Sequence, residues 1–154
     1  AWEEWMASEE AQAWDEGSNN VLECDNSTLS GWNFYTPGNT TMEDWSSFAT
    51  ATFECTFNEG KGTDDLKANV EEYNKWIDSN GSDDPYMYGV YFAEDNSDEG
   101  FIWLNWHDSF DSMETGNDNW AKTGQDVQAG FDDTATCSTP DLYNSAEFYS
   151  PDQS

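Results

Sequence analysis

From about Thr50 to its end, the chain switches repeatedly between two-residue and 3.6-residue periodicity, and this order of segments constrains the fold most. Alternating apolar and polar residues predict strands, whereas apolar residues at three- and four-residue spacing predict helices. The predicted order is strand, helix, strand, strand, helix, strand, over residues 52–58, 63–79, 86–92, 101–107, 109–131 and 142–149. This order predicts one compact α+β unit, a β-α-β-β-α-β sandwich. Gly116 and Gly124 predict a break in the second helix.

The first third of the chain resembles the trailing half of the same unit. Trp residues at helical spacing lie in a Glu-rich segment that ends at Gly17, and residues 29–35 predict a strand. Cys24 aligns with Cys137, and the Phe-Tyr pairs at 34–35 and 148–149 align after a one-residue shift. The alternative is that these short matches are coincidental.

The repeat leads to a division of the chain into three parts. We expect the trailing helix and strand of a first repeat, then a linker, then a complete repeat, over 1–38, 39–49 and 50–154. The chain would then be a tandem pseudo-dimer whose first copy is incomplete. A processed precursor, a longer parent chain or a second subunit could supply the remainder of that copy.

The three cysteines follow from the same interpretation. Cys55 lies on the first predicted strand and Cys137 lies just before the last one. These strands are neighbours in a β-α-β-β-α-β sandwich, so a Cys55–Cys137 disulfide is geometrically reasonable. Cys24 would have its partner outside this segment. The disulfide predicts an oxidising location, which is extracellular, periplasmic or on a particle surface. The alternative is three buried free thiols.

The net negative charge of the chain argues against nucleic acid and membranes as partners. The chain carries 33 acidic and four basic residues, a formal net charge of −29. Such a field repels phosphate backbones and anionic lipid, so we expect neither nucleic-acid binding nor membrane binding. No run of eighteen apolar residues is present, which argues against membrane insertion. The acidity favours salty, marine-like surroundings over a specific cationic partner, because salt screens self-repulsion.

The layout resembles a known superfamily. The order of elements, with a Cys-x-Phe-Asn-x-Gly-Lys stretch at 55–61 before the first helix, is similar to the ferredoxin-like units of the dimeric α+β barrel superfamily. Its most similar members are antibiotic-biosynthesis-monooxygenase-like proteins, including acidic tandem-repeat proteins of marine bacteria. The resemblance implies two sheets facing each other across a barrel, with ligands between sheet and helices or inside the barrel. It also implies cofactor-independent oxygenases or haem-degrading enzymes among the relatives.

One histidine supplies the main catalytic candidate. In the strand 101–107, alternation predicts Ile102, Leu104 and Trp106 under the helices, and Asn105 and His107 on the opposite face. Glu54 would share that opposite face. A histidine beside a buried carboxylate can act as a general base. The alternative is a hydrogen-bonded histidine at the strand end. The adjacent Asn105, Trp106 and His107 do not match the dispersed catalytic residues of the haem-degrading enzymes.

No metal or cofactor motif is complete. Residues 95–100 resemble the start of a calcium-binding EF-hand loop, but Trp106 stands where the bidentate Glu belongs. We therefore expect no cofactor, with calcium as a weak possibility.

Aromatic residues crowd the front segment beyond what its length can bury. Such residues suit a subunit interface. The candidates are Trp2, Trp5, Trp14, Trp32 and Trp45. The alternative is packing between the half repeat and the full one. The expected function is a non-catalytic, acidic extracellular or particle-surface assembly subunit that docks copies or host proteins through aromatic faces. The alternative is a cofactor-independent oxygenase or isomerase of the α+β barrel type, using His107, Asn105 and Glu54.

Overall fold

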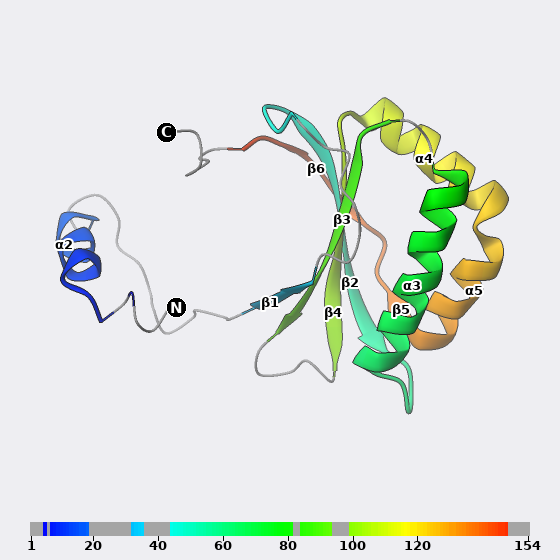
Figure 1. The fold of residues 1–154 in the computed structure, drawn as a ribbon, viewed down its shortest axis with the longest axis horizontal. Coiled ribbons are helices and arrows are strands. Elements are labelled where there is room, and N and C mark those ends of the chain that lie inside the picture. The colour runs from blue at the N-terminus through cyan, green and yellow to red at the C-terminus, as the bar shows by residue number, and fades with distance from the viewer. Residues whose placement is uncertain are drawn as a thin grey trace. The chain divides into compact units, whose positions relative to one another are not determined.

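A computed structural model gives the fold of the chain (Figure 1) and describes residues 5, 7–18, 32–35, 44–81, 84–93 and 99–147. The chain divides into two compact units, Ala1–Ser30 and Gly31–Ser154. In the first unit, helix α2 (Glu9–Ser18) begins with two glutamates, whose charge suits a helix N-terminus. Cys24 and residues 95–98 of the EF-hand-like segment lie outside the described residues.

The second unit is an α+β domain with an antiparallel open sheet. Its elements are β1 (Trp32–Tyr35), β2 (Phe48–Phe57), α3 (Thr63–Asn80), β3 (Tyr86–Ala93), β4 (Gly100–His107), α4 (Phe110–Thr123), α5 (Gln125–Thr134), β5 (Ala135–Cys137) and β6 (Asp141–Ser145). The strand order is β1-β3-β4-β2-β5, and β6 also pairs with β2. All of these pairings are antiparallel, and the order is compatible with a ferredoxin-like fold.

All six segments predicted after Thr50 are present, with two differences in detail. The predicted second helix is divided at Gly124 into α4 and α5, whereas Gly116 lies within α4. The last strand is also divided: β5 was not predicted, and β6 ends at Ser145. Residues 53 and 54 of β2 face three residues, 138–140, so the last strand carries one extra residue there.

The helices α3, α4 and α5 lie on one face of the sheet (Figure 1). Leu66 and Val70 of α3 pack against Val90 and Phe101, so the predicted apolar stripe of α3 does face the core. Burying these side chains and their aromatic neighbours supplies the main stabilisation of the unit.

The prediction of which β4 face the helices cover was wrong. Phe101 and Trp103 belong to the core cluster with α3, whereas Ile102, Leu104 and Trp106 lie on the other face and are half-buried. Both faces of β4 are rich in large apolar residues, so alternation identifies the strand without identifying its inner face.

The predicted disulfide is present. Cys55 and Cys137 are directly paired in the β2–β5 ladder, with their Cα atoms 4.0 Å apart. The bond joins residues separated by 82 positions and attaches β5, which directly follows α5, to β2.

A candidate ligand cavity between sheet and helices

A cavity of about 580 Å³ lies between the sheet and the helices of the second unit. This volume falls within the usual range for small-molecule sites. Strands β2 and β4 supply one wall, through Phe53, Trp103, Asn105 and His107 among others, and the helices supply the opposite wall. The cavity is therefore built from the same inner face that forms the core.

Asn105 is held at the cavity by two hydrogen bonds to one atom. Its Oδ1 accepts from the Tyr86 hydroxyl and from Trp103 Nε1, each at 2.8 Å. The Tyr86 hydroxyl has a single proton and donates it to Asn105, so it accepts from the Tyr73 hydroxyl at 2.6 Å. With Oδ1 engaged twice, the Nδ2 group is the donor that Asn105 can offer to a ligand.

The tyrosines of this network stay neutral across the physiological pH range. Burial raises the pKa of Tyr73 to about 12, against a smaller opposing effect of its hydrogen bond to Tyr86. Burial, together with the neighbouring Tyr73, raises the pKa of Tyr86 well above its ordinary value. Both side chains therefore act as hydroxyl groups and not as phenolates.

His107 lies at the end of β4 and is buried, with 6% of its surface exposed. Burial lowers its pKa to about 4, although Asp108 and Asp84 favour the protonated form. The imidazole is therefore neutral near pH 7. Its ring lies 4.8 Å from the Tyr86 ring between centroids, and a Cβ at Gly116 would lie 3.3 Å from its Cε1.

Aromatic rings in several orientations form much of the cavity wall. Trp120 is nearly perpendicular to Trp76 at 85° and to Tyr73 at 88°, with centroid distances of 4.7 and 5.3 Å. Phe131 meets Trp103 at 81° and 5.5 Å. These rings therefore pack edge-to-face on one another along the cavity wall.

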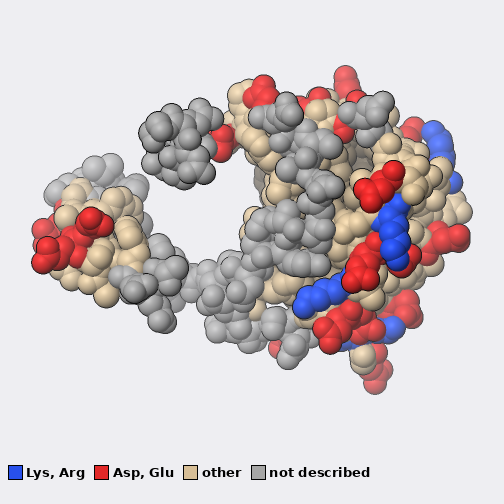
Figure 2. All heavy atoms as spheres, in the orientation of Figure 1, with Lys and Arg blue, Asp and Glu red and all other residues tan. Residues whose placement is uncertain are grey.

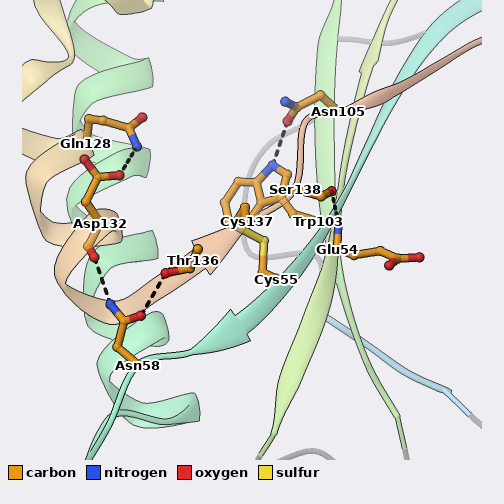
Figure 3. The surroundings of a disulfide bond; sticks show 10 residues. All are labelled: Glu54, Cys55, Asn58, Trp103, Asn105, Gln128, Asp132, Thr136, Cys137 and Ser138. Carbon is orange, nitrogen blue, oxygen red and sulfur yellow. Dashed lines mark hydrogen bonds between the residues drawn. A yellow bond between two sulfur atoms is a disulfide. The ribbon is translucent and has the colours of Figure 1, made fainter.

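At the end of the cavity away from His107, a series of hydrogen-bonded side chains and the disulfide line the wall. Trp120 Nε1 donates to Gln128 Oε1 at 2.8 Å, and Gln128 Nε2 donates to Asp132 Oδ1 at 2.7 Å. Cys55 and Cys137 line the same cavity. Figure 3 shows Trp103 and Asn105 on the helix side of β4 and the disulfide next to Trp103.

The cavity wall carries two carboxylates and no lysine. Asp84 and Asp132 line it, whereas none of the four lysines does, and the structure describes all four. Lys61 is bound instead to Asp133 at 2.6 Å and Lys75 to Glu72 at 2.6 Å. Figure 2 shows acidic side chains spread over the visible face of the helices, with the lysines interspersed among them.

Only part of the predicted catalytic group is brought together. Asn105 and His107 both line the cavity, but Glu54 is exposed on the opposite face of the sheet, where it points away from the helices (Figure 3). The sequence groups Glu54 with them because the β4 face that carries Asn105 and His107 is expected to point away from the helices, as Glu54 does. In the actual register Glu54 pairs with Ile102, and both lie on the face opposite the helices.

The predicted interface tryptophans are divided between the two compact units. Trp5 and Trp14 are 37% and 60% exposed, and their rings contact each other at 6.1 Å. Trp45 packs edge-on against Phe48 and Trp106. The backbone of Trp32 lies in β1, while its side chain and the whole of Trp2 fall outside the described residues.

The sequence prediction missed the tyrosines and the helical part of the cavity. Tyr73 and Trp76 fall within the helix predicted over 63–79, and Tyr86 within the strand predicted over 86–92, and none of the three is predicted to lie at a site. One signal was available: antiparallel pairing of the hairpin places Tyr86 opposite His107. No comparable pattern predicts that Trp120 and Gln128 line the cavity, because their positions depend on how α4 and α5 are oriented on either side of Gly124.

No family model, curated protein or solved structure matches this chain. Within the described residues, no group of three or more His, Cys, Asp or Glu side chains could hold a metal ion. Among those same residues, no helix is long and apolar enough to cross a membrane.

Proposed function

We propose that this protein binds a small organic molecule in the cavity between its sheet and its helices. The observation that carries the proposal is the convergence of Asn105 and His107 on a cavity of about 580 Å³ walled by aromatic rings. Apolar walls with a few fixed polar groups are the usual composition of a small-molecule site. The hydrogen-bonded Asn105 supplies a positioned donor, and neutral His107 supplies a second polar contact.

The same geometry favours binding over catalysis. Glu54 cannot assist His107 from the other face of the sheet. A histidine whose pKa lies near 4 is a weak general base at neutral pH. The oxygenase or isomerase alternative would therefore need another base among the residues at the cavity.

Ligand-observed NMR with a panel of small aromatic and aliphatic fragments tests this function. Binding fragments should lose affinity in Asn117→Trp, because Asn117 is exposed at the cavity and a large ring there would obstruct it. Asp118→Trp is the matched control, since Asp118 is the next residue and does not line the cavity. A panel without binders, or equal losses in both variants, would contradict the proposal.

A second candidate is assembly with a second copy of the chain through the sheet face opposite the helices, which carries Met87, Ile102 and Leu104. These side chains are only half-buried, although they are large and apolar. The charge of −29 opposes association at low salt, so association should increase as salt screens the repulsion. Light scattering of the chain and of Leu104→Lys in low and high salt tests it, with Leu142→Lys as an exposed apolar control. A monomer at every salt concentration would exclude it.

The wider assignment is also a proposal. The strand order and the disulfide support a ferredoxin-like unit of the dimeric α+β barrel kind, with residues 1–38 as the trailing part of another copy. The disulfide supports an extracellular, periplasmic or particle-surface location. The strongly acidic composition supports salty surroundings and argues against nucleic-acid partners.

A further inference from the structure

We propose that the ligand of this cavity is an organic cation, of the class of methylated ammonium compounds. This inference rests on the proposed function, because it assigns a ligand class to the same cavity. It depends on two independent properties of the wall, its aromatic faces and its charge.

The aromatic faces are suited to a cation without strong hydrogen-bond donors. The ring quadrupole attracts positive charge at the face of Trp most strongly, and then at Tyr and Phe. Trp76, Trp103 and Trp120 all line the cavity, as do Tyr73 and Phe131. Trp120 is nearly perpendicular to both Trp76 and Tyr73, so these three rings of the wall do not lie in one plane.

The charges at the cavity wall also favour a cationic ligand. Asp84 lines the cavity together with His107, so it places negative charge at that end of the cavity. Asp132 adds negative charge at the other end, where Gln128 fixes its carboxylate. An anionic ligand would meet two carboxylates and no lysine, in a chain of net charge −29.

The hydrogen-bonding groups argue against a simple metal ion and for an organic one. The described residues hold no cluster able to ligate a metal. The wall instead offers the Asn105 amide and the neutral imidazole of His107, which suit a hydroxyl or carbonyl on the ligand. A methylated ammonium group with a short polar arm satisfies both the rings and these groups.

The test compares choline with 3,3-dimethylbutan-1-ol, which has the same shape without the charge. Calorimetric titrations of the full chain in about 1 M NaCl screen the general attraction of cations to the acidic surface. Choline should bind roughly tenfold more tightly than the alcohol, the size expected for a desolvated cation–π contact. Equal affinities, or no choline binding while other fragments bind, would overturn the cation assignment and leave the cavity function intact.

Two variants, each with a control, test whether the preference for choline arises in this cavity. Trp120→Leu should remove most of the preference for choline, whereas Trp106→Leu on the opposite sheet face should preserve it. Asp84→Asn changes no buried ring and is therefore the safer variant for folding. It should weaken choline several-fold without affecting the alcohol, and Asp118→Asn should change neither. If Asp84→Asn and Trp120→Leu both retain the full preference, the cation is bound elsewhere and the inference is wrong.

Discussion

The hydroxyl of Tyr86 donates a hydrogen bond to Oδ1 of Asn105 at 2.8 Å, and the same oxygen accepts from Trp103. Replacing Asn105 by Leu removes the acceptor of two partly buried donors. An unsatisfied buried donor costs about 1–3 kcal/mol, so Asn105→Leu should lower the free energy of unfolding by about 2–4 kcal/mol. Urea denaturation measures the change. Asn144→Leu on β6, where Asn144 is exposed, should stay within about 0.5 kcal/mol of the parent. A loss under 1 kcal/mol in Asn105→Leu would contradict the network.

His107 should make the protein less stable as the pH falls. Its pKa is about 4 in the folded chain and near 6.5 when unfolded, so only the unfolded state gains a proton between these values. The contribution of neutral His107 to the free energy of unfolding is fully present above pH 6.5, declines as the pH falls to 4, and is absent below that. The free energy of unfolding lost between these two pH values is about 3 kcal/mol.

The single histidine makes this measurement direct. An NMR titration of the His107 Cε1 proton should give a midpoint near 4. In His107→Gln, the free energy of unfolding from denaturation curves should lack the part of the decline between pH 6.5 and 4 that His107 causes. Any pH dependence that comes from the carboxylates should remain. A midpoint above 6 would show that the imidazole is solvated.

The Cys55–Cys137 bond should contribute about 4 kcal/mol, because it restricts a long loop in the unfolded chain. The double variant Cys55→Ala, Cys137→Ala should show this loss in guanidinium denaturation. A reductant should then lower the stability of the parent and leave the double variant unchanged. Equal stability of parent and double variant without reductant would mean that the bond does not form in solution.

Cys24 should not pair with either of those residues. The disulfide in the second unit already occupies Cys55 and Cys137, and the repeat predicts a partner for Cys24 outside this segment. Peptide mass mapping without reduction should find the 55–137 crosslink and Cys24 as a thiol or in an external disulfide. A Cys24–Cys55 or Cys24–Cys137 peptide would remove the basis of the repeat alignment.

Gly124 should be intolerant of a side chain for a reason specific to the cavity. A Cβ there would overlap the ring of Trp120 and force that wall to move. Gly124→Ala should cost about 1–3 kcal/mol and change the tryptophan fluorescence. Gly17→Ala has open space around its Cβ and should leave stability unchanged or slightly higher. Equal behaviour of the two variants would contradict the packing of Trp120 on Gly124.

The local periodicity of the chain was sufficient to predict most of the elements. Strand β3, strand β4 and helix α3 lie within two residues of their predicted bounds, and Gly124 breaks the second helix as expected. The disulfide was predictable as well, since strand order alone makes Cys55 and Cys137 neighbours.

The inner face of the sheet was not predictable in the same way. Trp103 and Trp106 are comparable in size and belong to opposite faces, so no local pattern decides which one meets the helices. The choice depends on the total packing against α3, which is a property of the whole unit. The misplacement of Glu54 followed from this ambiguity.

The irregular junction between β5 and β6 has a consequence for how the protein behaves at high concentration. Residues 138–140 bulge opposite residues 53 and 54 of β2, and Pro140 lacks an amide proton, so the outer rim of the sheet is not a continuous row of donors and acceptors. At the opposite rim, β1 pairs along β3. Fibril growth by strand addition requires a long, regular rim, and an interrupted one resists it. A domain this rich in aromatic strands is thereby shielded from amyloid-like polymerisation on the Ser138 side.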